Sequence, residues 1–478
     1  MNRFHICIVA ILVMAGIVTS CSQGEKKALE VPSRSIIVAM PGDVGSTTFD
    51  SHNITSLTPT TVPNGWEVVN IDMYTSTITV KAPESFDNEE VESGTLSLKG
   101  YTPTGNTKSV DVFLAIVPKE VDYTAAPANC YVAYEPKVRY KFDPTRAGNG
   151  SMVLPTANVR LLYQTTESLI RYLDMRDGFA TFYIAPDTDD NGNELDTLIP
   201  GNAIVGAYDA DGNLIWTWHI WVTNTNPFDN TITLGGVTMM NQNLGADTNN
   251  EGKSDTDAIG RSYGLYYQWG RKEPLAGPKN WNFSLNADDV LYDYNDYEIS
   301  VGYVESSEGG STEWTNIHPQ YVVIGNPDND YDWLYDSHDD ALWSAEAKTN
   351  NDPCPAGWHV ADSKVFESLT ISAADDAMMW EEAQKMYGWW LEDTTSGEKY
   401  FFSAAGRRNY LDGRLDNMNV NDECPVPWSG YYWTASVDGN KAKALYFNLN
   451  TNTRTWNGIE TSRSMQRANA MPVRCVKE

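Results

Sequence analysis

The stretch PCPAGWHV, residues 353–360, places a cysteine between two prolines and before a Trp-His pair, and MPVRCVKE, residues 471–478, ends the chain with another cysteine. A nucleophilic Cys354 would need a histidine and an orienting group nearby, and a zinc site would need ligands paired at short spacing. Neither C-x-x-C nor a closely spaced histidine pair occurs anywhere in the chain. In an oxidising compartment we therefore favour a disulfide, and closing the loop from Cys354 to Cys475 would contribute at most about 4–5 kcal/mol.

The N-terminus indicates the compartment. Residues 1–20 contain a basic Arg3, an apolar run and then small residues, which is the layout of a secretory signal peptide. The apolar run is shorter than the roughly 20 residues that a membrane-spanning helix needs. The sequence VTSC, residues 18–21, resembles a bacterial lipobox, in which the signal is cut before a cysteine that is then lipidated. We therefore expect Cys21 to be the lipidated N-terminus, followed by a polar tether over residues 21–35.

Four cysteines remain after Cys7 leaves with the signal peptide and Cys21 takes the lipid. Four cysteines allow three pairings, and the sequence alone does not choose among them. Two of the four, Cys130 and Cys424, lie in different expected domains, so we expect them to stay unpaired.

The chain is acidic and rich in aromatic residues. Its 478 residues carry 34 Lys and Arg against 64 Asp and Glu, a net charge of −30. Such a charge argues against nucleic acid as a partner, because phosphate binding needs a basic surface. The length predicts several domains, and 16 Trp and 26 Tyr suit either β-rich cores or sugar binding.

Short alternating stretches divided by Gly, Pro, Asn and Asp predict β structure in the first half. We expect one β-sandwich over residues 36–117 and a second β-rich module over residues 118–227. Residues 228–478 combine strand patterns with two helical patterns, which predicts an α+β domain without βαβ alternation. The expected fold is multidomain and mainly β, with two immunoglobulin-like β-sandwich modules followed by this third domain.

Several motifs in the last part carry a resemblance to a known family. They are NQNLGA at 241–246, GLYYQWGRKEP at 264–274, DPCPAGWHVADSKVFESL at 352–369, GYYWTASV at 430–437 and PVRCVKE at 472–478. Together they resemble the Fibrobacter succinogenes major paralogous domain, a C-type-lectin-like fold of Bacteroidetes surface lipoproteins. Residues 201–227 likewise resemble the unit that precedes this domain in fimbrillin-like lipoproteins.

The resemblance implies surface display and a binding or adhesive role, without implying a reaction. It matches Cys354 and Cys475 to the family's two cysteine positions. The calcium-binding Glu-Pro-Asn or Gln-Pro-Asp triplet of C-type lectins is missing, because Glu273 and Pro274 are followed by Leu275. We therefore expect no metal and no cofactor.

Polar and aromatic residues gather around the last strands, where a lectin-like domain would present its ligand face. Arginine and tryptophan at an exposed patch are typical of residues that dominate binding energy. The candidate contacts are Arg407, Asn409, Tyr410, Trp428, Trp433, Arg454 and Trp456.

Three other motifs read better as structure than as active sites. The G-x-S-x-G pattern around Ser262 lacks the strand-turn-helix context of a nucleophile elbow. The stretch 187–195 begins like a calcium loop but has Leu198 where a bidentate Glu is needed, so a β-turn is favoured. The acidic stretch 328–340 could hold a metal, but such runs are usually solvated surface. Its functional alternative is a polar aromatic loop for ligand contact, because the stretch also carries Tyr331, Trp333 and Tyr335.

These observations predict a lipid-anchored protein of the outer membrane, exposed on the cell surface, that binds a glycan or a protein and is not an enzyme. One alternative is a structural or tip-associated fimbrial subunit with fimbrial partners. The other is a lectin-fold enzyme resembling the formylglycine-generating oxygenases, which use a reactive cysteine pair.

Overall fold

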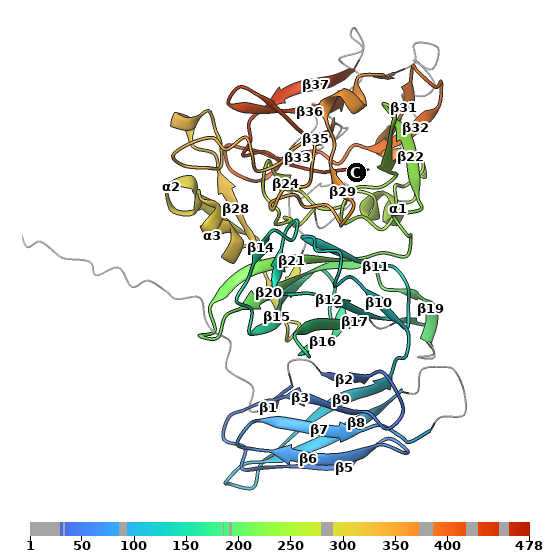
Figure 1. Cartoon of the computed structure of the whole chain (residues 1–478), viewed down its shortest axis with the longest axis vertical. Coiled ribbons are helices and arrows are strands. Elements are labelled where there is room, and N and C mark those ends of the chain that lie inside the picture. Colours follow the sequence, from blue (N-terminus) through green and yellow to red (C-terminus); the bar gives the residue numbers. More distant parts are fainter. Residues whose placement is uncertain are drawn as a thin grey trace, which may run out of the picture.

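Three tiers of β-sheet are stacked along the long axis of the molecule in the computed structural model (Figure 1). The structure describes residues 29–31, 34–85, 93–184, 186–190, 194–278, 290–371, 386–416, 429–448 and 458–478. The chain is mainly β and multidomain, as expected. Among the described residues, no helix is both long and apolar enough to cross a membrane.

The first tier, module 1, is a β-sandwich. A four-stranded sheet in the order β2-β9-β8-β5 faces a three-stranded sheet in the order β3-β7-β6, with the short pair β1-β4 beside them. Alternating side chains such as Ile78 and Val80 fill the space between the sheets and are fully buried. The strands are β1 (Leu29–Glu30), β2 (Ser35–Val38), β3 (Val44–Thr48), β4 (Asp50–Ser51), β5 (Ser56–Thr61), β6 (Glu67–Asp72), β7 (Thr77–Lys81), β8 (Ser93–Tyr101) and β9 (Thr107–Ile116).

Strand β2 runs parallel to β9, the last strand of module 1. The register pairs Ser35 with Phe113 and Val38 with Ile116. The first strand of the larger sheet is thus bonded to the strand that leads out of the module.

The second tier, module 2, also has two main sheets. One has the order β10-β12-β17-β16, and the other contains β11-β21-β20-β15. Their core includes the fully buried rings of Tyr140, Phe142 and Phe182. The strands are β10 (Glu120–Asp122), β11 (Cys130–Ala133), β12 (Arg139–Phe142), β13 (Arg146–Ala147), β14 (Met152–Val153), β15 (Asn158–Gln164), β16 (Ile170–Arg176), β17 (Phe179–Ile184), β18 (Pro186–Thr188), β19 (Glu194–Leu198), β20 (Gly201–Tyr208) and β21 (Leu214–Val222).

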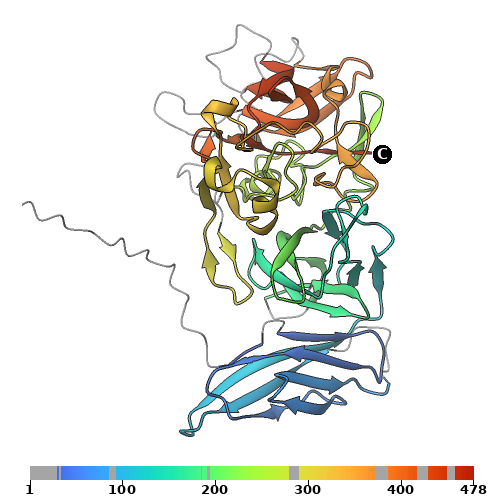
Figure 2. The ribbon, with the colours of Figure 1, turned by 60° about the vertical axis from the view of Figure 1, so that its left-hand side comes forward.

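A hairpin from the third part of the sequence extends this second sheet. Strands β25 (Leu291–Tyr292) and β26 (Glu298–Ile299) pair with each other, and Tyr292 pairs with Gln164 of β15. Figure 2 shows this yellow hairpin reaching from the upper tier down beside module 2. The sheet of module 2 is therefore completed by residues far away in the sequence.

The third tier, the C-terminal domain, is built from several small sheets and short helices. The elements are β22 (Thr231–Leu234), β23 (Val237–Met240), α1 (Thr256–Arg261), β24 (Tyr267–Gln268), β27 (Gly302–Glu305), α2 (Ser306–Gly309), α3 (Thr312–Ile317), β28 (Tyr321–Ile324), η1 (Pro327–Asn329), β29 (Trp358–Val360), η2 (Ser363–Phe366), β30 (Leu369–Thr370), β31 (Gly388–Asp393), β32 (Lys399–Ser403), β33 (Arg407–Arg408), β34 (Leu415–Asp416), β35 (Ser429–Asp438), β36 (Lys441–Asn448), β37 (Ile459–Met465), β38 (Ala470–Met471) and β39 (Cys475–Lys477).

The expected disulfide between Cys354 and Cys475 is present and buried. It lies beside the pairing of β29 with β39, in which Val360 faces Cys475. The helix expected after Cys354 is reduced to the single 3₁₀ turn η2, in which the Asp362 side chain caps the Lys364 amide. Most of the second expected helix lies outside the described residues.

Module 2 and the C-terminal domain share one hydrophobic core. Cys130, Val132 and Trp221 of module 2 pack in the same buried cluster as Trp269 and Cys354. The backbone of Cys130 bridges Pro355, and the Trp221 indole donates a hydrogen bond to the Ala246 carbonyl. The two tiers are therefore joined by a continuous apolar interior rather than by a linker.

Candidate functional site

Six side chains form a continuous row of rings and guanidinium groups on the C-terminal domain. The Tyr331 and Tyr410 rings meet edge to face, with centroids 4.8 Å apart. The Arg407 guanidinium lies 6.0 Å from the Tyr410 ring and 5.3 Å from the Tyr431 ring. The order along this stacked row is Tyr331, Tyr410, Arg407, Tyr431, Tyr446 and Arg463.

The second half of the row lies on the sheet β35-β36-β37. Tyr431 on β35 is paired with Tyr446 on β36, and their ring centroids are 5.0 Å apart. Arg463 on β37 places its guanidinium 4.0 Å from the Tyr446 ring. Cross-strand neighbours on one face of a sheet are held at contact distance by the register, so this part of the row is fixed by β pairing.

The row is buried at its centre and accessible at both ends. Tyr431 and Tyr446 are 4% and 6% exposed, whereas Arg407 and Tyr410 are half-buried and the Arg463 side chain is 36% exposed. Burial raises the pKa of the Tyr431 hydroxyl to about 12, although the charge of Arg407 opposes this shift. The accessible part of the row presents tyrosine rings beside arginine cations, which can stack on apolar faces and donate hydrogen bonds to oxygen atoms.

The loop that carries Tyr331 is tied to the neighbouring elements through its backbone. The Gly325 amide donates to the Tyr410 carbonyl at 2.9 Å, and the Ala468 amide donates to the Tyr331 carbonyl at 3.2 Å. Asn409 shapes the adjacent turn, since its side chain accepts a hydrogen bond from the Leu411 amide at 2.9 Å. Asn409 thus orients the chain around Tyr410.

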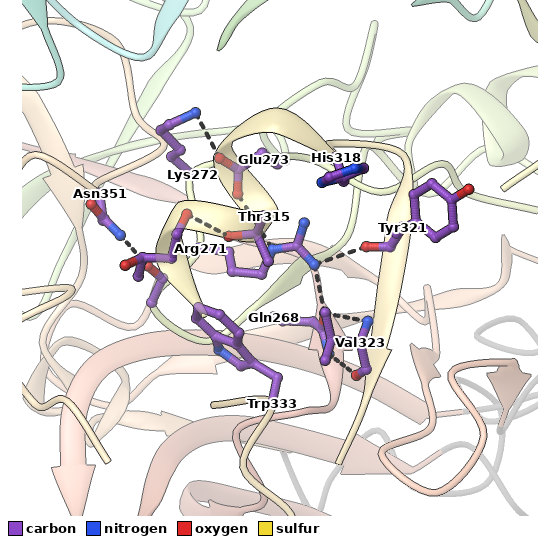
Figure 3. A network of polar contacts seen from close by, with 12 residues as sticks. Gln268, Arg271, Lys272, Glu273, Thr315, His318, Tyr321, Val323, Trp333 and Asn351 are labelled. Atoms are coloured by element: carbon purple, nitrogen blue, oxygen red, sulfur yellow. Dashed lines mark hydrogen bonds and ion pairs between the residues drawn. The ribbon is translucent and has the colours of Figure 1, made fainter. Parts of the chain in front are cut away.

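A buried polar network lies beneath β28, the strand that precedes this loop (Figure 3). Gln268 donates to the Val323 carbonyl at 2.7 Å and accepts from the Val323 amide at 3.1 Å. Arg271 donates to Gln268 at 2.7 Å and to the Tyr321 carbonyl at 2.9 Å. The indole of Trp333, farther along the same loop, donates to the Trp269 carbonyl at 2.7 Å. The network therefore holds both β28 and the loop that supplies Tyr331.

The same network carries three buried charges at the boundary with module 2. Glu273 lies 2.6 Å from the Lys272 ammonium and 3.3 Å from the Arg271 guanidinium, and all three side chains are at most 2% exposed. Lys272 also donates to the Thr217 hydroxyl of β21 at 2.7 Å and lies 4.2 Å from the Trp216 ring. The charged triplet thus links the C-terminal domain to module 2.

Burial and charge act in opposite directions on these groups. Burial raises the pKa of Glu273, but the charges of Lys272 and Arg271 outweigh it and hold this pKa below its usual value. Burial lowers the pKa of Lys272 by more than the charge of Glu273 raises it. The carboxylate therefore depends on its two cations and is not available to a ligand.

Two of the expected contact residues, Arg407 and Tyr410, take part in the stacked row, and Asn409 lies between Arg408 and Tyr410 in the adjoining turn. Trp433 does not fit the expected role, because it is fully buried and its indole donates to the Tyr267 carbonyl at 2.8 Å. It packs in the shared core. The remaining three, Trp428, Arg454 and Trp456, lie outside the described residues, as do Cys21 and Cys424.

Three members of the row were missed by the sequence analysis: Tyr431, Tyr446 and Arg463. A usable signal was present for two of them. Tyr431 follows the segment 417–428 by a few residues and Tyr446 precedes the segment 449–457, so both lie at strand ends next to the expected ligand loops. Strand ends place side chains where loops can reach them.

The other motifs serve the fold. Ser262 is buried at the end of α1, donates to the Ile259 carbonyl and contacts the Ser403 hydroxyl at 2.9 Å, so it is no exposed nucleophile. In the acidic stretch, buried Asp332 bonds His338 at 2.8 Å, and Asp340 pairs with Arg467. Within the described ranges, no three His, Cys, Asp or Glu side chains are grouped to hold a metal.

No family model and no curated protein matches the chain. Several solved structures are similar over parts of it. A Bacteroides ovatus mixed-linkage glucan utilization locus protein, SGBP-B in complex with a heptasaccharide, shares 12% identity over 40% of this chain and 43% of its own, with a TM-score of 0.14. The present chain thus spans less than half of that protein.

Two further solved structures complete the comparison. The D00-D0 domain of intimin shares 10% identity over 40% of this chain and 96% of its own, with a TM-score of 0.15. A chimeric titin Z1Z2 with a decorin peptide shares 12% identity over 39% of this chain and 91% of its own, with a TM-score of 0.14. At such TM-scores these likenesses say nothing about function.

Proposed function

We propose that the protein is a lipid-anchored binding protein or adhesin of the outer cell surface, and that its C-terminal lectin-like domain binds a glycan or a protein. The stacked row carries this proposal. Its accessible rings suit the C–H face of a sugar or an aromatic side chain, and its arginines suit hydroxyl and carboxylate oxygens. Arginine and tyrosine are also the residues that dominate binding energy at protein interfaces.

The anchor and the location rest on the N-terminal sequence. The layout of residues 1–20 and the motif that ends at Cys21 support secretion and lipidation. A ligand-binding domain at the far end of two stacked β modules would be held away from the membrane surface. The stacking of the three tiers along the long axis of the molecule (Figure 1) supports a role in which the C-terminal domain is held away from the membrane.

We propose binding rather than catalysis. The alternative as a lectin-fold oxygenase requires a reactive cysteine pair, whereas Cys354 and Cys475 are joined and buried. Labelling by iodoacetamide of either cysteine in the folded, unreduced protein would contradict the binding proposal and favour that enzyme. The role as a fimbrial subunit stays a prediction, and polymers in size-exclusion chromatography would support it.

The test is a glycan array probed with the soluble chain of residues 22–478, with and without calcium. We expect saturable binding to at least one glycan class, and we expect Arg407→Ala and Tyr410→Ala to weaken it at least tenfold. Arg160→Ala is the matched control, because this exposed arginine also stacks on a tyrosine, Tyr208, but in module 2.

A protein ligand would instead give no glycan signal and would be sought by crosslinking on intact cells. Binding of either kind that is unchanged in Arg407→Ala and Tyr410→Ala would refute the assignment of the site to the stacked row.

A further inference from the structure

A polar cleft of about 330 Å³ lies where module 1, module 2 and the hairpin β25-β26 meet. Module 1 contributes Arg34 and the β8-β9 side chains Thr95, Asp111 and Phe113, while module 2 contributes residues from β15 and β16. The turn of the hairpin contributes Tyr294 and Asp296. Such a volume is at the lower end for small-ligand sites. The cleft is far in the sequence from the stacked row and shares no residue with it.

The floor of the cleft is a carboxylate that is held from three segments of the chain. Asp296 accepts hydrogen bonds from the Ser168 amide and hydroxyl, both at 2.8 Å, and from the Gln164 amide at 3.2 Å. Arg34 of module 1 donates to the same carboxylate at 3.2 Å. The four donor atoms, on Ser168, Gln164 and Arg34, fix the position of this group, so the floor is built before any ligand arrives.

The turn that presents Tyr294 is equally well held. The Asp293 side chain accepts hydrogen bonds from the Asn295 amide at 2.8 Å and the Tyr297 amide at 3.0 Å. Tyr294 remains 39% exposed at the edge of the cleft. A tyrosine that is exposed on a rigid turn beside polar groups offers a flat apolar face at little entropic cost.

Two charged side chains line the cleft, one from module 1 and one from module 2. Asp111 lies on β9 and Arg171 on β16, both are exposed, and the described residues provide no hydrogen bond or ion pair for either. A carboxylate accepts two hydroxyl groups side by side, and a guanidinium donates two parallel hydrogen bonds. As far as the described part of the chain shows, both groups are open to a ligand with neighbouring hydroxyls.

The charges of the lining residues balance, with Arg34 and Arg171 against Asp111 and Asp296. These four residues add no net charge at the cleft, and the net charge of −30 of the whole chain disfavours an anion. A neutral ligand with many hydroxyls and an apolar face satisfies the lining better than a charged ligand. We propose that this cleft binds a short neutral saccharide, with Tyr294 stacking on a sugar ring and Asp111 and Arg171 bonding its hydroxyls.

Isothermal titration calorimetry of residues 22–478 tests this site with four neutral probes: maltohexaose, cellohexaose, mannohexaose and xylohexaose. Hexagalacturonate serves as an anionic probe. We expect at least one neutral probe to bind and the anion to bind at least tenfold more weakly. We expect Tyr294→Ala and Arg171→Ala each to weaken the neutral probe at least tenfold.

Tyr74→Ala is the matched control, because this tyrosine is 98% exposed in module 1 and is not part of the cleft. Circular dichroism checks that each variant is folded. If Tyr294→Ala misfolds, Arg171→Ala still tests the cleft, because Arg171 is exposed and its replacement should not disturb the fold. Silence of all neutral probes, a preference for hexagalacturonate, or binding unchanged in both cleft variants would overturn the proposal. Binding lost in Arg407→Ala instead of the cleft variants would also overturn it, while supporting the stacked row.

Discussion

Replacing Glu273 by Gln removes the only carboxylate of the buried triplet and leaves Arg271 and Lys272 as neighbouring cations without a counter-ion. At the observed separations of 2.6 and 3.3 Å, the two attractions are about 6 and about 5 kcal/mol at an effective dielectric constant near 20. Burying the carboxylate costs several kcal/mol, which offsets part of this gain. We expect Glu273→Gln to lower the free energy of unfolding by about 3–5 kcal/mol.

Urea unfolding followed by tryptophan fluorescence measures this loss, because Trp216 and Trp333 are buried beside the triplet. Glu313→Gln on the exposed side of α3 is the matched control and should change the free energy by less than about 0.5 kcal/mol. Replacing the whole triplet by Met, Met and Leu should recover most of the loss, since no charge then remains buried. A loss below about 1 kcal/mol in Glu273→Gln would refute the reasoning.

The wild-type protein should show the same interaction as a pH dependence. The folded pKa of Glu273 is depressed, so its contribution to stability is fully present above the unfolded pKa near 4.5. That contribution is lost as the pH falls through the depressed pKa of the folded protein. Glu273→Gln should therefore reduce the acid-dependent loss of stability below pH 4.5, and an unchanged pH profile would contradict this assignment.

Removing the disulfide by Cys354→Ser with Cys475→Ser should lower the free energy of urea unfolding by up to about 4–5 kcal/mol, because it opens a closure of 121 residues; an unchanged midpoint would show that the closure is not stabilising. Gly148→Ala should destabilise the boundary between module 2 and the C-terminal domain, since a Cβ would lie 2.4 Å from the Asn350 carbonyl oxygen at φ +51°. Gly212→Ala is the control, because Gly212 has φ +84° but open space around it, so only the backbone cost of about 1–2 kcal/mol should appear in thermal melts. Equal losses of stability in the two variants would refute the close approach of Gly148 to Asn350. Cys130 is a buried free thiol whose pKa is raised by burial, so mass spectrometry should find it alkylated by iodoacetamide only after unfolding.

Local patterns predicted the strand-rich fold, because alternation and punctuation by Gly and Pro depend on nearby residues. The match of Cys354 and Cys475 came from the resemblance to a known family, since four cysteines allow three pairings. Local patterns did not predict which strands pair. The parallel pairing of β2 with β9 and the docking of β25 on β15 join residues that are distant in the sequence. No local feature of YND in the turn at 294–296 indicates that Asp296 receives donors from two other modules.

Charge and aromaticity were the least reliable guides to the site. The triplet Arg271, Lys272 and Glu273 looks like solvated surface in the sequence, yet its mutual pairing allows it to be buried. The sequence analysis took Trp433 for a surface contact. Strand β35 is buried on both faces around it, so the sequence there has no alternation of apolar and polar residues that would mark Trp433 as core. Arg407 and Tyr410 were found because they lie in a polar segment, on the short strand β33 and in the turn that follows it, where exposure and function coincide.

The parallel pairing of β2 with β9 also determines how the molecule responds to tension. When the chain is pulled at its two ends, the short pair β1-β4 is loaded first. Force then enters β2 at Ser35 and leaves β9 at Ile116, and these two strands are drawn in opposite directions along their common axis. The hydrogen bonds between them are then loaded together in shear, whereas strands peeled from one end break their bonds one after another. Forced unfolding is governed by the unfolding rate, and shear loading raises the barrier that sets this rate. The pairing of β2 with β9 therefore makes module 1 resistant to unfolding by a force applied through an N-terminal tether.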